Sequence, residues 1–150
     1  ARQLQSHGVV PTVIELNVDM VRALRSEGID AIYGDATRID TIEAAGAATA
    51  AHAILSSAGM SNSAEVIRMV RTINPQIRVL ARTSYLREVA ELRAAGATHV
   101  YSGEGEIALA FVENILNTLG ATPEQIDRER ARVHADLVAS HDFRPESVTS

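Results

Sequence analysis

The chain has 150 residues, of which 46% are hydrophobic and 3% aromatic, and it carries a formal net charge of −5. A core of Ala, Val, Ile and Leu with few aromatic residues is typical of a parallel sheet between helices, and the length suits one domain. The 14 basic residues are all arginines and are scattered, which argues against nucleic-acid binding. The lack of cysteine excludes disulfides, zinc–thiolate sites and thiol nucleophiles. No apolar stretch approaches the roughly 20 residues that cross a bilayer.

Helix and strand patterns alternate along the chain. Residues 1–7 predict a helix that ends at Gly8, because glycine readily takes the left-handed conformation after a helix. We expect the strand and glycine-rich turn that precede such a helix to be outside this sequence, in a longer gene product. The later strands are predicted at residues 9–15, 29–33, 52–57, 77–81 and 99–101, with helices at 18–27, 37–45, 63–73, 85–95 and 107–119.

Residues 122–150 read as one charged helix and a tail. Thr122, Pro123 and Gln125 form a helix start signal, with threonine as the N-cap, proline in the first turn and glutamine at the third position. The helix is predicted over residues 124–137, and residues 141–150 are predicted to be disordered.

The alternation predicts an α/β fold, a Rossmann-like doubly wound parallel sheet that lacks its first strand in this chain. Residues 1–120 are expected to form this domain, truncated at its N-terminus, and residues 121–150 a charged helix and flexible tail.

Two acidic residues stand where apolar runs stop, at the predicted carboxyl ends of two strands. Glu15 closes Val13-Ile14-Glu15, and Asp35 follows Tyr33-Gly34. Ligands bind at this edge of an open parallel sheet, and a carboxylate there can accept hydrogen bonds from both ribose hydroxyls. Two alternatives stay open: Glu15 is simply solvated, or Asp35 caps the helix that starts near Thr37.

From Val9 to Gly120 the sequence resembles the RCK or TrkA-N family, the regulatory nucleotide-binding domains of potassium channels and transporters. It is most similar to the cytoplasmic domains of Kef-like cation:proton antiporters. The segments that carry the resemblance are Val13-Ile14-Glu15, Tyr33-Gly34-Asp35-Ala36-Thr37, Ala81-Arg82-Thr83, Leu92-Arg93-Ala94-Ala95-Gly96-Ala97 and Gly105-Glu106-Ile107-Ala108.

The resemblance implies a role for individual residues. Glu15 matches the acid that holds the adenosine ribose, and Asp35, with Ala36 and Thr37 beside it, matches the acid near the adenine. Ser56 and Ser57 match a strand end near the phosphate or second sugar. Arg82 matches a basic residue near the nucleotide and the regulatory ligand. Glu104 stands where some relatives place a cation ligand at an interface.

These later matches have structural alternatives. The two serines can be an ordinary strand end, Arg82 can pair with an acid, and Glu104 can be an acid favoured in the first turn of its helix. The five histidines have no ligand spacing, so we expect no metal site.

The function that the resemblance implies is a regulatory domain on the cytoplasmic face of a membrane. It would bind NAD(H) or another adenine nucleotide and control potassium or cation transport by an attached or partner membrane protein. The alternatives are a fragment of an NAD(P)-dependent oxidoreductase and a structural dimerisation module with a vestigial pocket. We expect no enzyme, because the residues after Gly120 are too few for a substrate domain.

The helix over residues 106–119 is apolar on most of its circumference, so it needs two partners. In the family that the chain resembles, this helix packs against a second copy. The alternative is that the following charged helix folds back and covers it.

Overall fold

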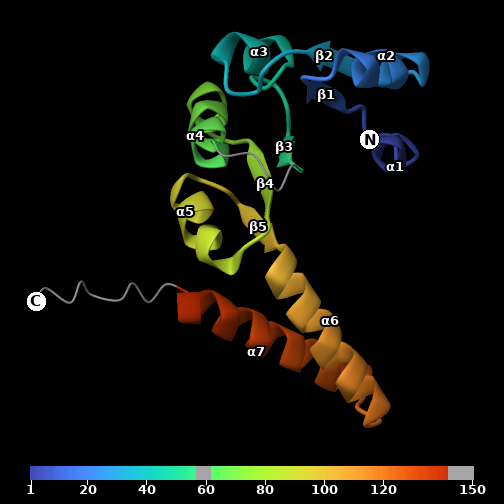
Figure 1. Ribbon diagram of the computed structural model, residues 1–150, viewed down its shortest axis with the longest axis vertical. Helices are drawn as coiled ribbons and strands as arrows, with labels where there is room; N and C mark the ends of the chain where they lie inside the picture. The colour runs from blue at the N-terminus through green and yellow to red at the C-terminus, as the bar shows by residue number, and fades with distance from the viewer. Residues whose placement is uncertain (57–61, 142–150) are drawn as a thin grey trace, which may run out of the picture. The chain divides into compact units, whose positions relative to one another are not determined.

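The computed structural model describes residues 1–56 and 62–141, and the predicted strand end at Ser57 and the predicted tail beyond His141 lie outside them. Helices and strands alternate as predicted (Figure 1). The strands are β1 (Thr12–Glu15), β2 (Asp30–Tyr33), β3 (His52–Leu55), β4 (Arg78–Thr83) and β5 (His99–Ser102). The helices are α1 (Arg2–Gln5), α2 (Val18–Ser26), α3 (Ile39–Ala44), α4 (Ser63–Ile73), η1 (Leu86–Glu88), α5 (Val89–Ala94), α6 (Gly103–Thr118) and α7 (Pro123–His141).

The strands form two sheets. One contains β1 and β2 in parallel, and the other has the order β3-β4-β5, with β4 and β5 parallel. These orders match the two halves of a doubly wound sheet of order 3-2-1-4-5-6 from which strand 1 is omitted. The predicted α/β fold class is therefore confirmed. The described residues form two compact units, one of residues 1–53 with 64–78 and the other of residues 54–56, 62–63 and 79–141.

Helices α2 and α4 contribute buried apolar residues to the first unit. Each carries apolar residues at helical spacing, and Val21 of α2 and Ile67 of α4 are buried. Asn17 caps α2 by accepting hydrogen bonds from the N–H groups of Asp19 and Met20. Gly28 ends that helix with a φ of 75°, a conformation that costs glycine little. These local signals are in the sequence, which is why α2 was predicted almost to the residue.

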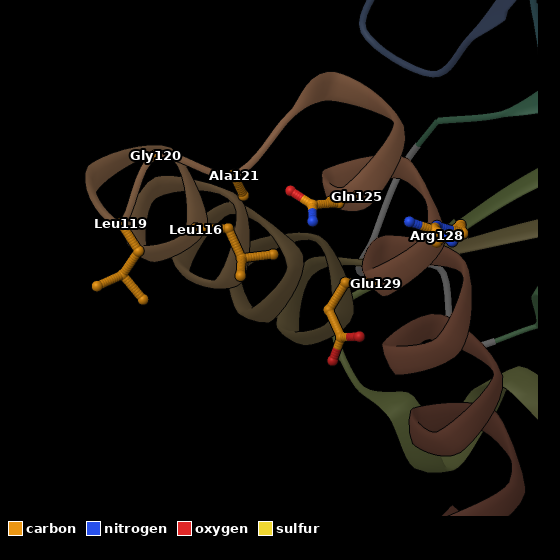
Figure 2. A pocket seen from close by; sticks show the side chains of 7 residues that line it. All are labelled: Leu116, Leu119, Gly120, Ala121, Gln125, Arg128 and Glu129. Carbon is orange, nitrogen blue, oxygen red and sulfur yellow. The ribbon is translucent and has the colours of Figure 1, made fainter.

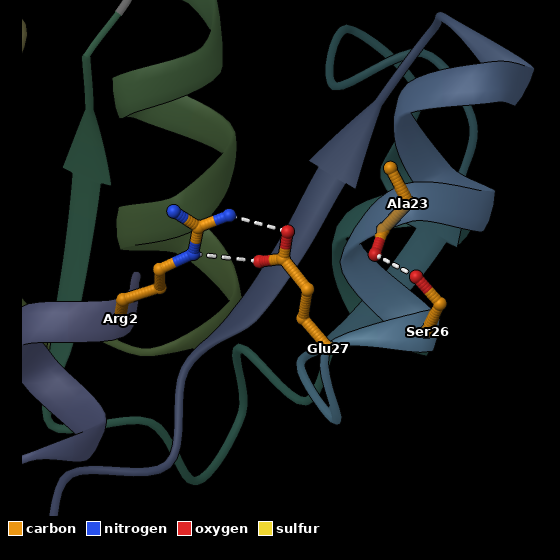
Figure 3. A network of polar contacts seen from close by, with 4 residues as sticks. All are labelled: Arg2, Ala23, Ser26 and Glu27. Atoms are coloured by element: carbon orange, nitrogen blue, oxygen red, sulfur yellow. Dashed lines mark hydrogen bonds and ion pairs between the residues drawn. The ribbon is translucent and has the colours of Figure 1, made fainter.

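Helix α1 is attached to the C-terminal end of α2 by side-chain hydrogen bonds. The guanidinium of Arg2 pairs with both carboxylate oxygens of Glu27, with Nε to Oε2 at 2.7 Å (Figure 3). Gln5 donates to the backbone oxygen of Gly28 at 3.1 Å. The hydrogen bonds from Arg2 lower the pKa of Glu27. A helix of four residues is too short to be stable alone, so these bonds fix its position.

In the second unit, α5 packs against β5, and α7 packs along α6. Thr122 and Gln125 form the predicted capping box, since each side chain accepts a hydrogen bond from the other residue's N–H. Glu113 of α6 pairs with Arg130 of α7. The helices of the described ranges include none that is both long and apolar enough to cross a membrane.

Several predicted boundaries were wrong, and three of the elements start at least two residues away from the predicted position. The first strand begins at Thr12 instead of residue 9, and Val9 and Val10 before it are exposed. Helix α3 begins at Ile39 instead of Thr37. Helix α6 begins at Gly103, because the Ser102 hydroxyl caps it by accepting from the N–H of Gly105 at 2.9 Å.

Candidate functional site

Glu15 and Asp35 lie at the same edge of the β1–β2 sheet. The strands are parallel, Glu15 is in register with Tyr33, and the N–H of Gly34 donates to the backbone oxygen of Glu15 at 3.1 Å. Asp35 is the next residue. The prediction that both acids follow adjacent parallel strands at one edge is confirmed.

The carboxylate of Glu15 is half-buried and held in place by the following turn. Its Oε1 accepts a hydrogen bond from the backbone N–H of Asn17 at 2.9 Å. Asn17 in turn caps α2 with its side chain, so the orientation of Glu15 depends on the start of that helix. No hydrogen bond to Oε2 is found among the described residues, and a carboxylate oxygen has lone pairs to spare for a ligand hydroxyl.

Asp35 is held in a similar way. Its Oδ1 accepts a hydrogen bond from the N–H of Thr37 at 2.8 Å, two residues along the chain. This bond, with further contributions from the Thr37 side chain and the charge of Arg38, lowers the pKa of Asp35. The carboxylate is therefore ionised at neutral pH. The alternative that Asp35 caps a helix is wrong, because α3 begins at Ile39 with Arg38 at the N-cap position.

Gly34 allows this turn to lie against α3. A Cβ at this position would be 2.7 Å from Cγ2 of Thr41, closer than real contacts. The backbone of Gly34 has no positive φ, so the requirement is space and not conformation. The half-buried segment Asp35-Ala36-Thr37 is thus placed by the packing of Gly34 on Thr41.

The second unit contains the other predicted site residues that the structure describes. Arg82 is exposed near the end of β4, in register with Tyr101. It makes no ion pair within residues 1–56 and 62–141, so the alternative of a pairing with an acid finds no support there. Ser56 is exposed directly after β3, and Ser57 lies outside the described residues. Glu15, Asp35, Ala36 and Thr37 are therefore brought together in one unit, whereas Ser56 and Arg82 belong to the other.

Glu104 has a structural role that the sequence did not reveal. Its Oε2 accepts from the N–H of Leu86 at 2.9 Å, and its own N–H donates to the backbone oxygen of Ser84 at 3.2 Å. These bonds tie the first turn of α6 to the turn that follows β4. In the part of the chain that the structure describes, no three potential ligand side chains gather into a metal site.

Sequence reasoning also missed the part of Asn17 in orienting Glu15. The available signal was the asparagine that stands two residues after the acid in the sequence. Tyr33 was missed as well: its side chain is 60% exposed and lies beside Glu15 in the register of the sheet.

Comparisons with known proteins find a matching family and similar sequences. The model of the TrkA-N domain family matches residues 1–103. The chain is 34% identical over 136 residues to the glutathione-regulated potassium-efflux system protein KefC of Cronobacter sakazakii, covering 91% of this chain and 21% of that protein. The chain thus spans about a fifth of the length of the curated relatives that it matches. These relatives are described as potassium-efflux system proteins.

Comparisons with solved structures also find a TrkA-N domain. The TrkA-N domain of the inner membrane protein ybaL from Escherichia coli has a TM-score of 0.72 and 31% identity, with 75% of this chain and 83% of that one covered. The Kef C-terminal domain of Shewanella denitrificans in AMP-bound form has a TM-score of 0.61 and 20% identity, with 87% and 96% covered, and this likeness shows the fold. The family match spans more than half of the chain, and the chain belongs to the TrkA-N domain family.

Proposed function

We propose that this chain is a regulatory domain that binds an adenine nucleotide, NAD(H) or a mononucleotide, and thereby controls potassium or cation transport by a membrane protein. The observation that carries the proposal is the pair of carboxylates, Glu15 and Asp35, at one edge of two parallel strands. Each is half-buried, and each has one oxygen oriented by the N–H of the residue two positions later. Such fixed acceptors suit the hydroxyl and amino groups of a nucleoside.

Each of the two acids is assigned a different part of the nucleoside. Glu15 accepts hydrogen bonds from the ribose hydroxyls, as acids at this strand end do in doubly wound folds. Asp35, Ala36 and Thr37 contact the adenine, with Ala36 as a small apolar surface and the carboxylate as an acceptor for the amino group. Ser56 and Ser57 are proposed contacts for the phosphate or second sugar, and Arg82 is a proposed basic residue near the nucleotide and the regulatory ligand. The AMP-bound form of the Kef domain that shares this fold supports the ligand class.

A second copy of the domain is the proposed partner of α6. Four apolar residues of this helix, spaced four apart, are exposed: Ile107 by 59%, Phe111 by 67%, Ile115 by 58% and Leu119 by 76%. We call them the α6 stripe. The alternative cover, α7, does fold back on α6, but it packs on another face and leaves the stripe exposed. A continuous apolar stripe on a charged domain favours association.

The proposal also includes a membrane transporter to which this domain is attached or with which it is paired. The matched KefC proteins are about five times as long as the aligned segment and are described as potassium-efflux system proteins. We propose that this domain lies on the cytoplasmic face of the membrane, attached to or paired with such a transporter. Nucleotide binding would favour one arrangement of two paired domains, and its effect on transport is limited by its difference in affinity for the two arrangements.

Calorimetric titration with AMP, ADP and NADH tests the proposal. Saturable binding of at least one of them, weakened by loss of Glu15, is the expected result. Failure of all three to bind at millimolar concentration would leave the structural dimerisation module. Turnover of NADH with a small-molecule substrate would instead favour the oxidoreductase fragment.

A further inference from the structure

Exposed apolar side chains gather at the carboxyl edge of the β1–β2 sheet, around the two acids of the candidate site. They follow β1, occupy the first turns of α2 and α3, and end β2: Leu16, Val18, Met20, Ile39 and Tyr33. Single exposed apolar residues are ordinary, but a group of them at one edge marks a surface that binds a ligand or partner. Tyr33 is the aromatic member of this group.

Tyr33 lies between the two acids along the edge of the sheet. It is in register with Glu15 on the neighbouring parallel strand, and it stands two residues before Asp35. Because side chains alternate along a strand, Tyr33 and Glu15 share one face of the sheet. Neighbouring strands are about 4.8 Å apart, which puts the tyrosine ring within reach of a ligand that the Glu15 carboxylate binds. Ala31, two residues earlier on the same face, is buried, so the ring lies where the covered part of this face ends.

The ring of Tyr33 is open to a ligand. Within residues 1–56 and 62–141, no hydrogen bond involves its hydroxyl. The arginine that lies over a tyrosine ring, Arg87, does so at Tyr85, with its guanidinium 4.2 Å from the ring centre. Tyr33 therefore has an aromatic surface that is not already used in such a contact.

We infer that Tyr33 is the surface on which the base of the nucleotide stacks. The inference rests on the proposed function, which assigns the ribose to Glu15 and the amino group of the base to Asp35. A base that joins these two contacts crosses the position of Tyr33. An aromatic side chain binds the face of a base whatever groups the base carries on its edge. Tyr33 thus supplies affinity, while Asp35 selects the adenine.

The rival position for a nucleotide is an open groove between the C-terminal end of α6 and the start of α7 (Figure 2). It has a volume of about 560 Å³, and Arg128 in its lining can attract a phosphate. The lining contains no aromatic side chain, however, and its acid, Glu129, is paired with Arg132. The groove therefore lacks the combination of aromatic ring and unpaired acid that the β1–β2 edge offers, and Arg128→Ala is a suitable control.

Calorimetric titration with AMP, and with ribose 5-phosphate as the same ligand without its base, tests the stack. Tyr33→Ala should raise the dissociation constant of AMP roughly fivefold to twentyfold, the lower part of the range for a base stacked on an aromatic side chain, because the ring is exposed. Tyr33→Phe keeps the ring and should remain within about twofold of wild type. An equal loss for ribose 5-phosphate would show that Tyr33 shapes the ribose site, and would overturn the stack.

Tyrosine fluorescence gives a direct readout, because the chain has three tyrosines and no tryptophan. In the variant Tyr85→Phe/Tyr101→Phe, Tyr33 is the sole tyrosine. AMP should change its emission along the saturation curve that calorimetry gives, since a stacked base touches the ring, and ribose 5-phosphate should not. Saturation with AMP without any change in emission overturns the inference. The control variants Tyr85→Ala and Arg128→Ala should bind AMP as wild type does.

The outcomes separate this inference from the proposed function. Absence of AMP binding to the wild-type chain overturns both. AMP binding that is weakened by Glu15→Ala but unchanged by Tyr33→Ala overturns the stack alone and keeps the ribose role. Loss of AMP affinity in Arg128→Ala but not in Tyr33→Ala overturns the stack and assigns the nucleotide to the groove of α6 and α7.

Discussion

The backbone N–H of Asn17 donates to the Glu15 carboxylate at 2.9 Å, while the Asn17 side chain caps α2. One residue thus connects a strand-end acid to the helix that follows it. The orientation of Glu15 is set before any ligand arrives, and a ligand therefore loses less conformational entropy on this side of the site.

Replacement of Glu15 by alanine should weaken adenine-nucleotide binding by about 1–3 kcal/mol, the scale of hydrogen bonds to a charged acceptor. Calorimetry with AMP and NADH on wild type and variant measures the difference. Asp30→Ala is the control, because this exposed acid lies at the opposite end of β2. Equal affinity of the Glu15 variant and wild type would reject the ribose role.

Asn17→Ala should lower the free energy of unfolding by about 0.5–2 kcal/mol, because α2 loses its side-chain cap. Asn17→Asp keeps an acceptor and should be close to wild type. Nucleotide affinity should change less than in the Glu15 variant, since the N–H that holds Glu15 belongs to the backbone. Urea unfolding monitored by circular dichroism gives the stability, and an unchanged midpoint for the alanine variant would contradict the cap.

Asp35 should titrate below its ordinary value of 3.8, because the hydrogen bond from Thr37 stabilises the charged form. A depressed folded-state pKa contributes stability above the unfolded-state value, and this contribution is lost as the pH falls through the folded-state value. The pH-dependent loss due to Asp35 is therefore confined to pH values below about 4, and Asp35→Asn should remove it. Carboxyl NMR titration reports the pKa; a value above 3.8 would be inconsistent with the observed turn.

Gly34→Ala should destabilise the fold by about 1–3 kcal/mol, because the new Cβ overlaps Cγ2 of Thr41. The double variant Gly34→Ala/Thr41→Ala removes the atom that clashes and should recover part of this loss. Thermal unfolding of the two single variants and the double variant forms a complete cycle. Additive effects in that cycle would show that the two residues do not meet.

Phe111→Asp should disrupt self-association, since it places a charge in the centre of the α6 stripe. Light scattering at micromolar concentration should show a dimer for wild type and a monomer for the variant. Val10→Asp is the matched control, because Val10 is 85% exposed and lies outside the stripe. A monomeric wild type would refute the pairing for this chain.

Elements defined by local signals were predicted well. Helix α4 has the predicted bounds because its apolar residues recur at helical spacing and Asn74-Pro75 follows it. The capping box of Thr122 and Gln125 needs only residues three apart, so it can be recognised in the sequence. The two acids were placed correctly because apolar runs in parallel strands end at a common edge.

What the sequence determined by itself was therefore the alternation of elements, the caps and the position of Glu15 and Asp35, since these depend on neighbours within a few residues. Only the tertiary structure decided how the first turn of α6, which begins after its local cap Ser102, is attached to the turn after β4, because Ser84 and Leu86 of that turn bond to Glu104. It also decided which face of α6 is covered by α7 and which remains as the stripe. Apolar periodicity shows that a helix needs partners, but the choice among them depends on residues distant in the chain.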